Sequence, residues 1–299
     1  SCSHIYIRTT NEKVSMKEVS TVVEDIYDIL DCLSSGEELD IPSEMVDEFG
    51  ERMKDVILHW AQPHKQSKGL RMSNIGRPAR QLWYEQNSES PPSPPKASTQ
   101  IKFLYGHLLE EVLLLLVKLS GHEVSDEQKK VEVDDIIGHI DCKIDGEVVD
   151  IKTASNFGFK KFKEGSLITD DPFGYMYQLA GYEEAEGTKG GGFLAINKET
   201  GELALFQPGD LTKPNVRPRI DVLKNNLQSD TPPERCYEPI PEGKKGNMRL
   251  GSSCSYCGFK NQCWSDSNNG RGLRAFKYSN GIKYFTRVTS TPNVQELFL

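Results

Sequence analysis

A long helix-like segment followed by three short strand-like runs constrains the fold of this chain more than any other feature. Leucines recur at helical spacing from Ile101 to Leu119, and Gly121 ends the pattern. Residues 131–137, 139–144 and 148–153 alternate between apolar and polar side chains, as half-buried strands do. Asp145-Gly146 between the last two runs is typical of a two-residue hairpin. We therefore expect an antiparallel meander directly after the helix.

The segments around this core also mix helices with strands. Residues 173–184 and 211–227 favour helices, and 192–196 and 203–206 favour strands joined by a turn at 199–201. This order predicts an α/β fold with a mixed central sheet flanked by helices. Two acidic amphipathic helices are expected before residue 61, so we assign a helical N-terminal extension to residues 1–66 and one main domain to residues 67–299. The Pro- and Ser-rich residues 88–99 favour a loop or linker.

The charge distribution indicates where a polyanion would bind. A formal net charge of -8 argues against nonspecific coating of nucleic acid. Residues 15–56 hold thirteen acidic and three basic side chains, whereas residues 243–287 hold nine basic side chains and one acidic side chain. We expect polyanions to meet the C-terminal third. The chain has no apolar run of about 20 residues for a membrane helix and no secretory pattern at its start, so a cytosolic location is expected.

Two aspartates and a lysine on the predicted hairpin suggest phosphodiester chemistry. Asp141 lies on one strand, and Asp150 and Lys152 project from the same face of the next strand. Paired carboxylates bind hard divalent cations, and a neighbouring lysine can orient or deprotonate the attacking water. The preceding helix offers a third carboxylate. Glu110 is the first choice, with His107 and Glu111 as alternatives.

The order of these motifs resembles the RecB-like branch of the PD-(D/E)XK nuclease superfamily, over about residues 101–184. The resemblance rests on Gly138-His139-Ile140-Asp141, on Asp150-Ile151-Lys152 and on a later helix containing Gln178 and Tyr182. It implies a restriction-endonuclease-like core and metal-dependent exonuclease action on single-stranded DNA or duplex ends. It also implies that Asp141 and Asp150 bind metal, that Lys152 serves the water and that Gln178 and Tyr182 support the site, although many members have histidine where this chain has Glu110. With Glu110 added from the helix, the predicted catalytic residues are Glu110, Asp141, Asp150, Lys152, Gln178 and Tyr182, and the predicted ligands of Mg²⁺ or Mn²⁺ are Glu110, Asp141, Asp150 and Ile151. Endonuclease or resolvase action, or a noncatalytic nucleic-acid-binding module, remains an alternative.

Three clustered cysteines predict a second, structural metal site. Cys254, Cys257 and Cys263 have the short spacings of thiolate ligands, and either Cys236 or Cys32 could be the fourth ligand, with Cys236 preferred. The spacing resembles the C-terminal part of the iron-sulfur staple of AddB-type and CRISPR-adaptation nucleases. Those relatives take the fourth cysteine from a segment before the core, which in this chain, at residues 76–84, contains none. The ligands suit Zn²⁺ or a [4Fe-4S] cluster equally, so we expect either at residues 236–263.

Basic and aromatic residues surround the cysteines. Lys260, Arg271 and Arg274 are the predicted nucleic-acid contacts, because cations and aromatic rings together hold a strand through its phosphates and bases. The C-terminal residues 294–299 could serve as a docking peptide for a replication or recombination protein, although a frayed terminus is the simpler expectation.

Overall fold

The computed structural model describes residues 17–63, 68–89 and 97–298, and its contacts divide the chain into two compact units. Unit 1 comprises residues 1–76 and 95–220, and unit 2 comprises residues 77–94 and 221–299. This division differs from the predicted boundary at residue 66, because the N-terminal helices pack into unit 1. No helix in the described ranges is both long and apolar enough to cross a membrane.

Unit 1 is built on a mixed five-stranded sheet, as predicted for an α/β fold. Strands β5 (Glu147–Ala154) and β6 (Gly192–Asn197) are parallel and the other neighbours are antiparallel. The parallel pair requires a crossover connection, which contains helices α5 (Asn156–Lys163) and α6 (Tyr175–Glu186) and the 3₁₀ turn η3 (Ser166–Ile168). The strands, in spatial order, are β1 (Val124–Ser125), β4 (Cys142–Ile144), β5 (Glu147–Ala154), β6 (Gly192–Asn197) and β7 (Leu203–Phe206).

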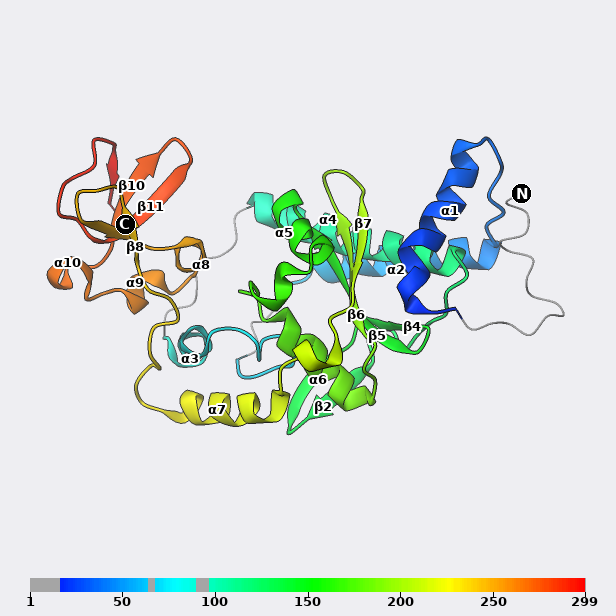
Figure 1. The fold of residues 1–299 in the computed structure, drawn as a ribbon, viewed down its shortest axis with the longest axis horizontal. Helices are drawn as coiled ribbons and strands as arrows, with labels where there is room; N and C mark the ends of the chain where they lie inside the picture. The colour runs from blue at the N-terminus through cyan, green and yellow to red at the C-terminus, as the bar shows by residue number, and fades with distance from the viewer. Residues whose placement is uncertain (1–16, 64–67, 90–96, 299) are drawn as a thin grey trace. The chain divides into compact units, whose positions relative to one another are not determined.

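Helices cover both faces of this sheet. α5 and α6 lie on one side, and α1 (Val22–Ser34) and α4 (Ala97–Leu119) lie on the other (Figure 1). The core between α1, α4 and the sheet is made of aliphatic side chains that alternate along the strands, which include Cys142, Ile144, Val149, Ile151, Leu194 and Ile196. Alternation leaves the intervening residues of β5, Asp150 and Lys152, on the opposite face.

The predicted meander contains four strands where three were expected. Residues 131–137, predicted as one strand, fold as a separate hairpin of β2 (Lys130–Val133) and β3 (Ile136–His139). Asp134 and Asp135 form its turn with φ of 47° and 62°, a left-handed conformation that aspartate tolerates better than most residues. The hairpin predicted at Asp145-Gly146 is confirmed, with φ of 51° and 84°.

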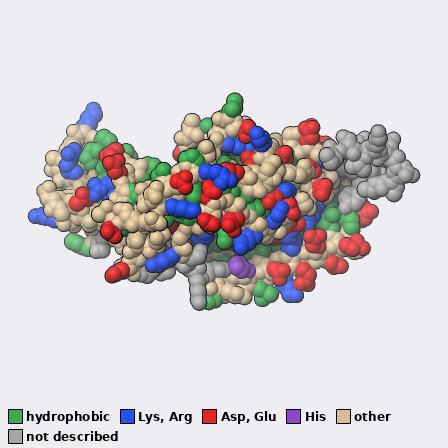
Figure 2. Space-filling model, turned by 90° about the horizontal axis from the view of Figure 1, so that it is seen from below, with side chains coloured by type: hydrophobic (Ala, Val, Ile, Leu, Met, Phe, Trp, Pro, Cys, Tyr) green, Lys and Arg blue, Asp and Glu red, His purple; other side chains and the backbone are tan. Residues whose placement is uncertain are grey.

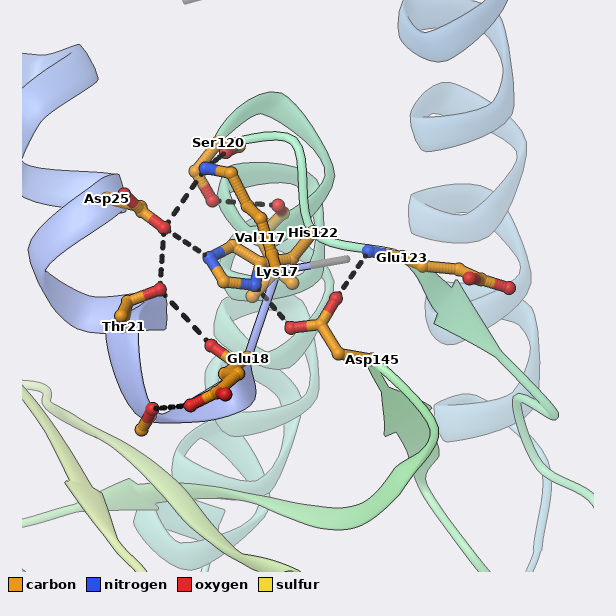
Figure 3. A network of polar contacts seen from close by, with 10 residues as sticks. Lys17, Glu18, Thr21, Asp25, Val117, Ser120, His122, Glu123 and Asp145 are labelled. Carbon is orange, nitrogen blue, oxygen red and sulfur yellow. Dashed lines mark hydrogen bonds and ion pairs between the residues drawn. The ribbon is translucent and has the colours of Figure 1, made fainter. Parts of the chain in front are cut away.

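Polar contacts fix the first helix onto unit 1. The side chain of His122 is fully buried, and its two ring nitrogens lie 2.6 Å from an oxygen of Asp145 and 2.8 Å from an oxygen of Asp25 (Figure 3). Lys17 extends this network, with its Nζ 3.0 Å from Asp25 and 2.6 Å from the carbonyl of Ser120. The short 3₁₀ helix η2 (Val19–Thr21) leads into α1, and α2 (Ser43–Trp60) packs on α4. The two N-terminal helices are therefore integral to unit 1.

Unit 2 combines short helices with an antiparallel five-stranded sheet. Its helices are α3 (Ala79–Asn87), α8 (Ser252–Ser255), α9 (Lys260–Cys263) and α10 (Ser267–Gly270). Helix α7 (Val216–Gln228) follows the 3₁₀ turn η4 (Asp210–Thr212), and it begins in unit 1 and ends in unit 2. The strand order is β12 (Glu296–Leu297), β10 (Arg274–Tyr278), β11 (Gly281–Arg287), β9 (Asn247–Arg249) and β8 (Ile240–Glu242). The predicted docking tail thus contains an edge strand.

Candidate active site and cysteine site

The two aspartates of the hairpin face each other across β4 and β5. Cys142 pairs with Val149, so the next position in the register sets Asp141 opposite Asp150 on the same face. The Asp150 side chain is 3% exposed. One carboxylate oxygen of Asp141 accepts a hydrogen bond of 2.8 Å from the main-chain N–H of Ile151, which fixes the Asp141 side chain against β5.

Lys152 lies beside these carboxylates on the same strand. Its Nζ forms an ion pair with Asp150 and lies 4.7 Å from the centre of the Tyr175 ring. Burial lowers the pKa of Lys152, but the charges of Asp150 and Asp141 outweigh burial and hold that pKa above its usual value. The lysine is therefore an ammonium at neutral pH in the cation-free protein. Tyr175, which sequence reasoning did not select, is the aromatic neighbour of this charge.

The carboxylate pair has the chemistry that a hard divalent cation requires. Burial, followed by the neighbouring charge of Asp150, raises the pKa of Asp141 to about 8. Asp150 Oδ2 is buried, and it is the oxygen that pairs with the Lys152 ammonium. A cation bound between the two carboxylates would neutralise the repulsion between them. Ile151 is apolar and its N–H is used by Asp141, so its carbonyl oxygen is the atom that could serve as a ligand.

Helix α4 brings one further carboxylate toward the pair. A Cβ on Gly106 would lie 3.2 Å from the Thr153 hydroxyl, so glycine allows α4 to approach β5 closely. One turn later, Glu110 lies 3.3 Å from His107 Nδ1, and the charges of both residues act on Asp141. Glu111 lies instead 3.5 Å from Arg52 of α2. Of the three candidates on α4, Glu110 and His107 therefore lie on the side of the aspartates and Glu111 does not.

Gln178 and Tyr182 of α6 form a hydrogen-bonded pair beneath this site. Gln178 Nε2 lies 3.3 Å from the Tyr182 hydroxyl, and the two side chains are buried. Burial raises the pKa of Tyr182 to about 12, and the charges of Asp150 and Asp141 add to the shift. A Cβ on Gly138 would lie 2.6 Å from the Tyr182 ring and 2.5 Å from Met72. Gly138 is thus required for packing under the site, a role that the sequence motif did not reveal.

Four cysteines of unit 2 line one cavity of about 40 Å³. Cys254 and Cys257 lie at either end of a tight turn, closed by a 3.1 Å main-chain hydrogen bond, and Cys263 ends α9. Cys236 completes the set, whereas Cys32 belongs to α1 in unit 1. Burial raises the pKa of Cys254 to about 11, and the thiols of Cys257, Cys263 and Cys236 contribute to the shift. The fourth cysteine preferred from the sequence is the one that the structure brings to the cavity.

Helix α3 approaches these thiols without supplying a cysteine itself. The Arg80 Nε donates a hydrogen bond of 3.1 Å to Cys263 Sγ, and the Arg80 guanidinium lies 5.6 Å from the centre of the Tyr84 ring. Burial raises the pKa of Cys236, and the main-chain N–H groups of Gln81 and Arg80 partly oppose that rise. These groups belong to the first turn of α3, where helix geometry favours negative charge. The four thiols therefore lie in a setting that suits a thiolate-bound group.

The thiols and carboxylates do not form a compact ligand shell. Among the described residues, no three His, Cys, Asp or Glu side chains are grouped closely enough to hold a single metal ion. At the hairpin the direct set is two carboxylates, and at the cysteine site the thiols surround a cavity rather than one point. The assignment of a metal ion or cluster to each site thus rests on the chemical type of the carboxylate and thiol ligands and on their location in the fold.

The predicted nucleic-acid contacts are partly engaged within unit 2. Arg274 forms two hydrogen bonds with Glu296, of 2.6 and 2.7 Å, and the Lys260 Nζ lies 4.9 Å from the centre of the Tyr284 ring. Arg271 is exposed at the end of α10. Lys, Arg, Asp and Glu side chains are intermingled on the face shown in Figure 2. Arg274 could bind a phosphate group only after its hydrogen bonds with Glu296 are broken.

Comparisons with known proteins identify no family for this chain. No family model and no curated protein matches the chain. A solved structure described as the crystal structure of SSO0001 aligns with 72% of this chain and 94% of its own, at 16% identity and a TM-score of 0.37. The functional argument therefore rests on the site itself.

Proposed function

We propose that this protein is a metal-dependent nuclease of the PD-(D/E)XK type that hydrolyses DNA, with the reaction centred on Asp141, Asp150 and Lys152. One observation carries the proposal: the carboxylates of Asp141 and Asp150 face each other across a hairpin beside the half-buried ammonium of Lys152, and burial together with the charge of Asp150 raises the pKa of Asp141 to about 8. Such an arrangement is costly in a protein that does not bind a cation.

Each side chain contributes a separate function to this reaction. A bound Mg²⁺ or Mn²⁺ would stabilise negative charge on the scissile phosphate and make hydroxide available near neutral pH. Asp141 and Asp150 would hold the cation, and the hydrogen bond from Ile151 to Asp141 keeps one carboxylate oriented. Lys152 is protonated, so it would orient the nucleophilic water and phosphate as a cation and hydrogen-bond donor. Gln178 and Tyr182 support that face of β5 from α6.

Exonuclease action is the favoured form of this activity, and endonuclease or resolvase action is the alternative within the same chemistry. The deciding experiment is incubation of end-labelled linear DNA and covalently closed circular DNA with and without Mg²⁺. Degradation of the linear substrate alone supports an exonuclease. Cleavage of the circle supports an endonuclease. A purified protein that binds DNA but degrades neither substrate would indicate the noncatalytic binding module.

The cysteine site is proposed to hold a structural [4Fe-4S] cluster in preference to Zn²⁺. A single zinc ion requires four sulfur atoms at about 2.3 Å from one point. A cluster takes one thiolate on each of its irons, so its ligands lie further apart around a larger group. Four thiols around a cavity, with Arg80 as a hydrogen-bond donor to one of them, suit the second arrangement better.

Cation binding should depend on pH through Asp141. Its pKa of about 8 means that the carboxyl is protonated in the cation-free protein below that pH, and the proton must leave before a cation binds. We expect the apparent affinity for Mn²⁺ to rise about tenfold per pH unit up to pH 8 and then to level off. Titration calorimetry between pH 6 and pH 9 measures this dependence.

The same raised pKa fixes the sign of a stability effect. Between the usual value of 3.8 and about 8, the folded protein holds a proton on Asp141 that the unfolded chain has lost, so the free energy of unfolding should fall as pH rises through this window. In Asp141→Asn this contribution should vanish. A Mn²⁺ affinity that does not change with pH in the unsubstituted protein would contradict the assignment.

Basic residues of unit 2 are proposed to hold the DNA strand. Simultaneous replacement of Lys260, Arg271 and Arg274 by alanine should weaken DNA binding and reduce the slope of log affinity against log salt concentration by about one per lost phosphate contact. Lys54→Ala, on acidic helix α2, is the matched control. An unchanged salt slope, measured by fluorescence anisotropy, would move the binding face elsewhere.

A further inference from the structure

The segment before α6 carries an exposed aromatic ring, Phe173, next to the tyrosine that contacts Lys152. Phe173 is 60% exposed, and its ring stacks on that of Tyr175, with centroids 5.5 Å apart and planes 27° apart. Tyr175 in turn packs against the buried rings of Phe162 and Phe193, each with its centroid 6.1 Å away. The aromatic stack is therefore buried at one end and open to solvent at the other.

The exposure of Phe173 is enforced by its backbone. The two carboxylate oxygens of Asp171 accept hydrogen bonds from the main-chain N–H groups of Tyr175 and Met176, at 2.9 and 2.8 Å. Gly174, with φ of 77°, touches the backbone of Gly76 so closely that a Cβ would lie 2.2 Å from the Gly76 carbonyl carbon. Because both sides of Phe173 are fixed, its ring is presented to solvent by ordered chain.

Other exposed phenylalanines of unit 1 lie on helices that contact β5, the strand of Asp150 and Lys152. In the described part of unit 1, the exposed phenylalanines are Phe103, Phe157 and Phe173. Phe103 precedes Glu110 by seven residues, or about two turns, on the same face of α4. Phe157 is the second residue of α5, three residues after the end of β5, and Lys161 Nζ lies 5.8 Å from the centre of its ring. The exposed phenylalanines of unit 1 thus lie on or beside the three helices that contact β5.

We propose that Phe173, supported by Tyr175, is a base-stacking platform that receives an unpaired nucleobase next to the reacting phosphate. This inference rests on the proposed nuclease function and specifies its substrate as a single-stranded segment of nucleic acid. A planar base on Phe173 extends the stack by one ring, since aromatic side chains stack with any base. Lys152, which contacts the other ring of the pair, lies within reach of the attached phosphate. A base within a duplex keeps its neighbours on both faces and offers no free face to Phe173.

The test compares Phe173→Ala with Phe173→Trp, both combined with Asp150→Asn so that no substrate is degraded. The probes are a short single-stranded DNA containing 2-aminopurine and the same sequence as a blunt duplex. Phe173→Ala should weaken single-strand binding about tenfold and abolish the quenching of 2-aminopurine that stacking causes. Phe173→Trp should restore both, and duplex binding should be the same in both variants.

Leu211→Ala serves as the control, because Leu211 is a fully exposed apolar side chain of unit 1 on a different segment. The inference is overturned if Phe173→Ala binds the single strand as tightly as the parent, or if it loses duplex affinity equally. With Asp150 restored, cleavage of single-stranded DNA by Phe173→Ala at the parental rate would reject the platform and leave the nuclease proposal intact. Absence of Mg²⁺-dependent cleavage in the unsubstituted protein would reject both.

Discussion

Asp150→Asn is expected to reduce phosphodiester hydrolysis by a factor on the order of a thousand or more, in a protein that remains folded. The substitution keeps the shape of the side chain but removes the charge that would hold the cation. It also removes the ion-pair partner of Lys152. The rate of release of labelled nucleotides from linear DNA, with Mg²⁺ in excess, measures the loss. Circular dichroism and a thermal melt establish that the variant is folded.

Lys152→Ala and Asp141→Asn should have losses of similar size for different reasons. Lys152→Ala leaves the carboxylates in place, so Mn²⁺ affinity should persist while turnover disappears. Asp141→Asn should lose both. Glu132→Gln, an exposed acid on β2 of the same unit, is the matched control and should keep its activity. Near-parental turnover by Asp150→Asn, with contaminating nuclease excluded, would remove the basis for the assignment.

Cys254→Ser is expected to produce the largest loss of stability, because a metal group bound by four thiolates contributes its binding free energy to folding. Unit 2 has small helices around the cysteines, of four residues each in α8 and α9, which are too short to be stable alone. We expect loss of bound metal and unfolding of unit 2, detected by limited proteolysis and by metal analysis after anaerobic purification. Iron with sulfide would indicate the cluster, and zinc would indicate the alternative.

Cys142→Ala is the control for Cys254→Ser, because it removes a thiol that is not a predicted metal ligand. Cys142 is fully buried in unit 1, and burial raises the pKa of its thiol well above the usual value, so it is a neutral packing residue. The variant should retain its full metal content. A protein purified without oxygen that contains neither iron nor zinc would contradict the cysteine assignment. Equal metal content in Cys254→Ser and the parent would do so as well.

The long helices and the strands β5, β6 and β7 were predictable from the sequence, whereas some other short elements were not. Residues 101–119 and 173–184 correspond to α4 and α6, because apolar side chains repeated over three or more turns indicate a helix. α5 has eight residues and two buried side chains, Phe159 and Phe162, which is too little for a periodic signal. The turn at Asp134-Asp135 lacks glycine, so the β2–β3 hairpin was predicted as a single strand.

The site residues that belong to a local sequence motif were predictable. Those that reach the site only through tertiary packing were not. Spacing alone indicated that Asp141, Asp150 and Lys152 share one hairpin. The choice among His107, Glu110 and Glu111 required knowing that Arg52 of α2 lies beside Glu111. Arg80 is 183 residues from Cys263, and no local pattern joins them. The same holds for Tyr175, whose ring meets Lys152 only because the crossover folds back over β5.

The buried imidazole of His122 has a consequence for any attempt to shorten this protein. Asp145 lies at the tip of the β4–β5 hairpin, in which Asp150 lies on β5 and Asp141 directly precedes β4, and Asp25 lies on the first helix. A chain trimmed to begin after α1 would open His122 and the apolar face of α4 to water, at the turn that sets the strand register. The strongly acidic N-terminal helices could be taken for a separate extension that can be removed. Truncation there would instead destabilise the hairpin of the candidate site, so a minimal catalytic fragment should retain α1.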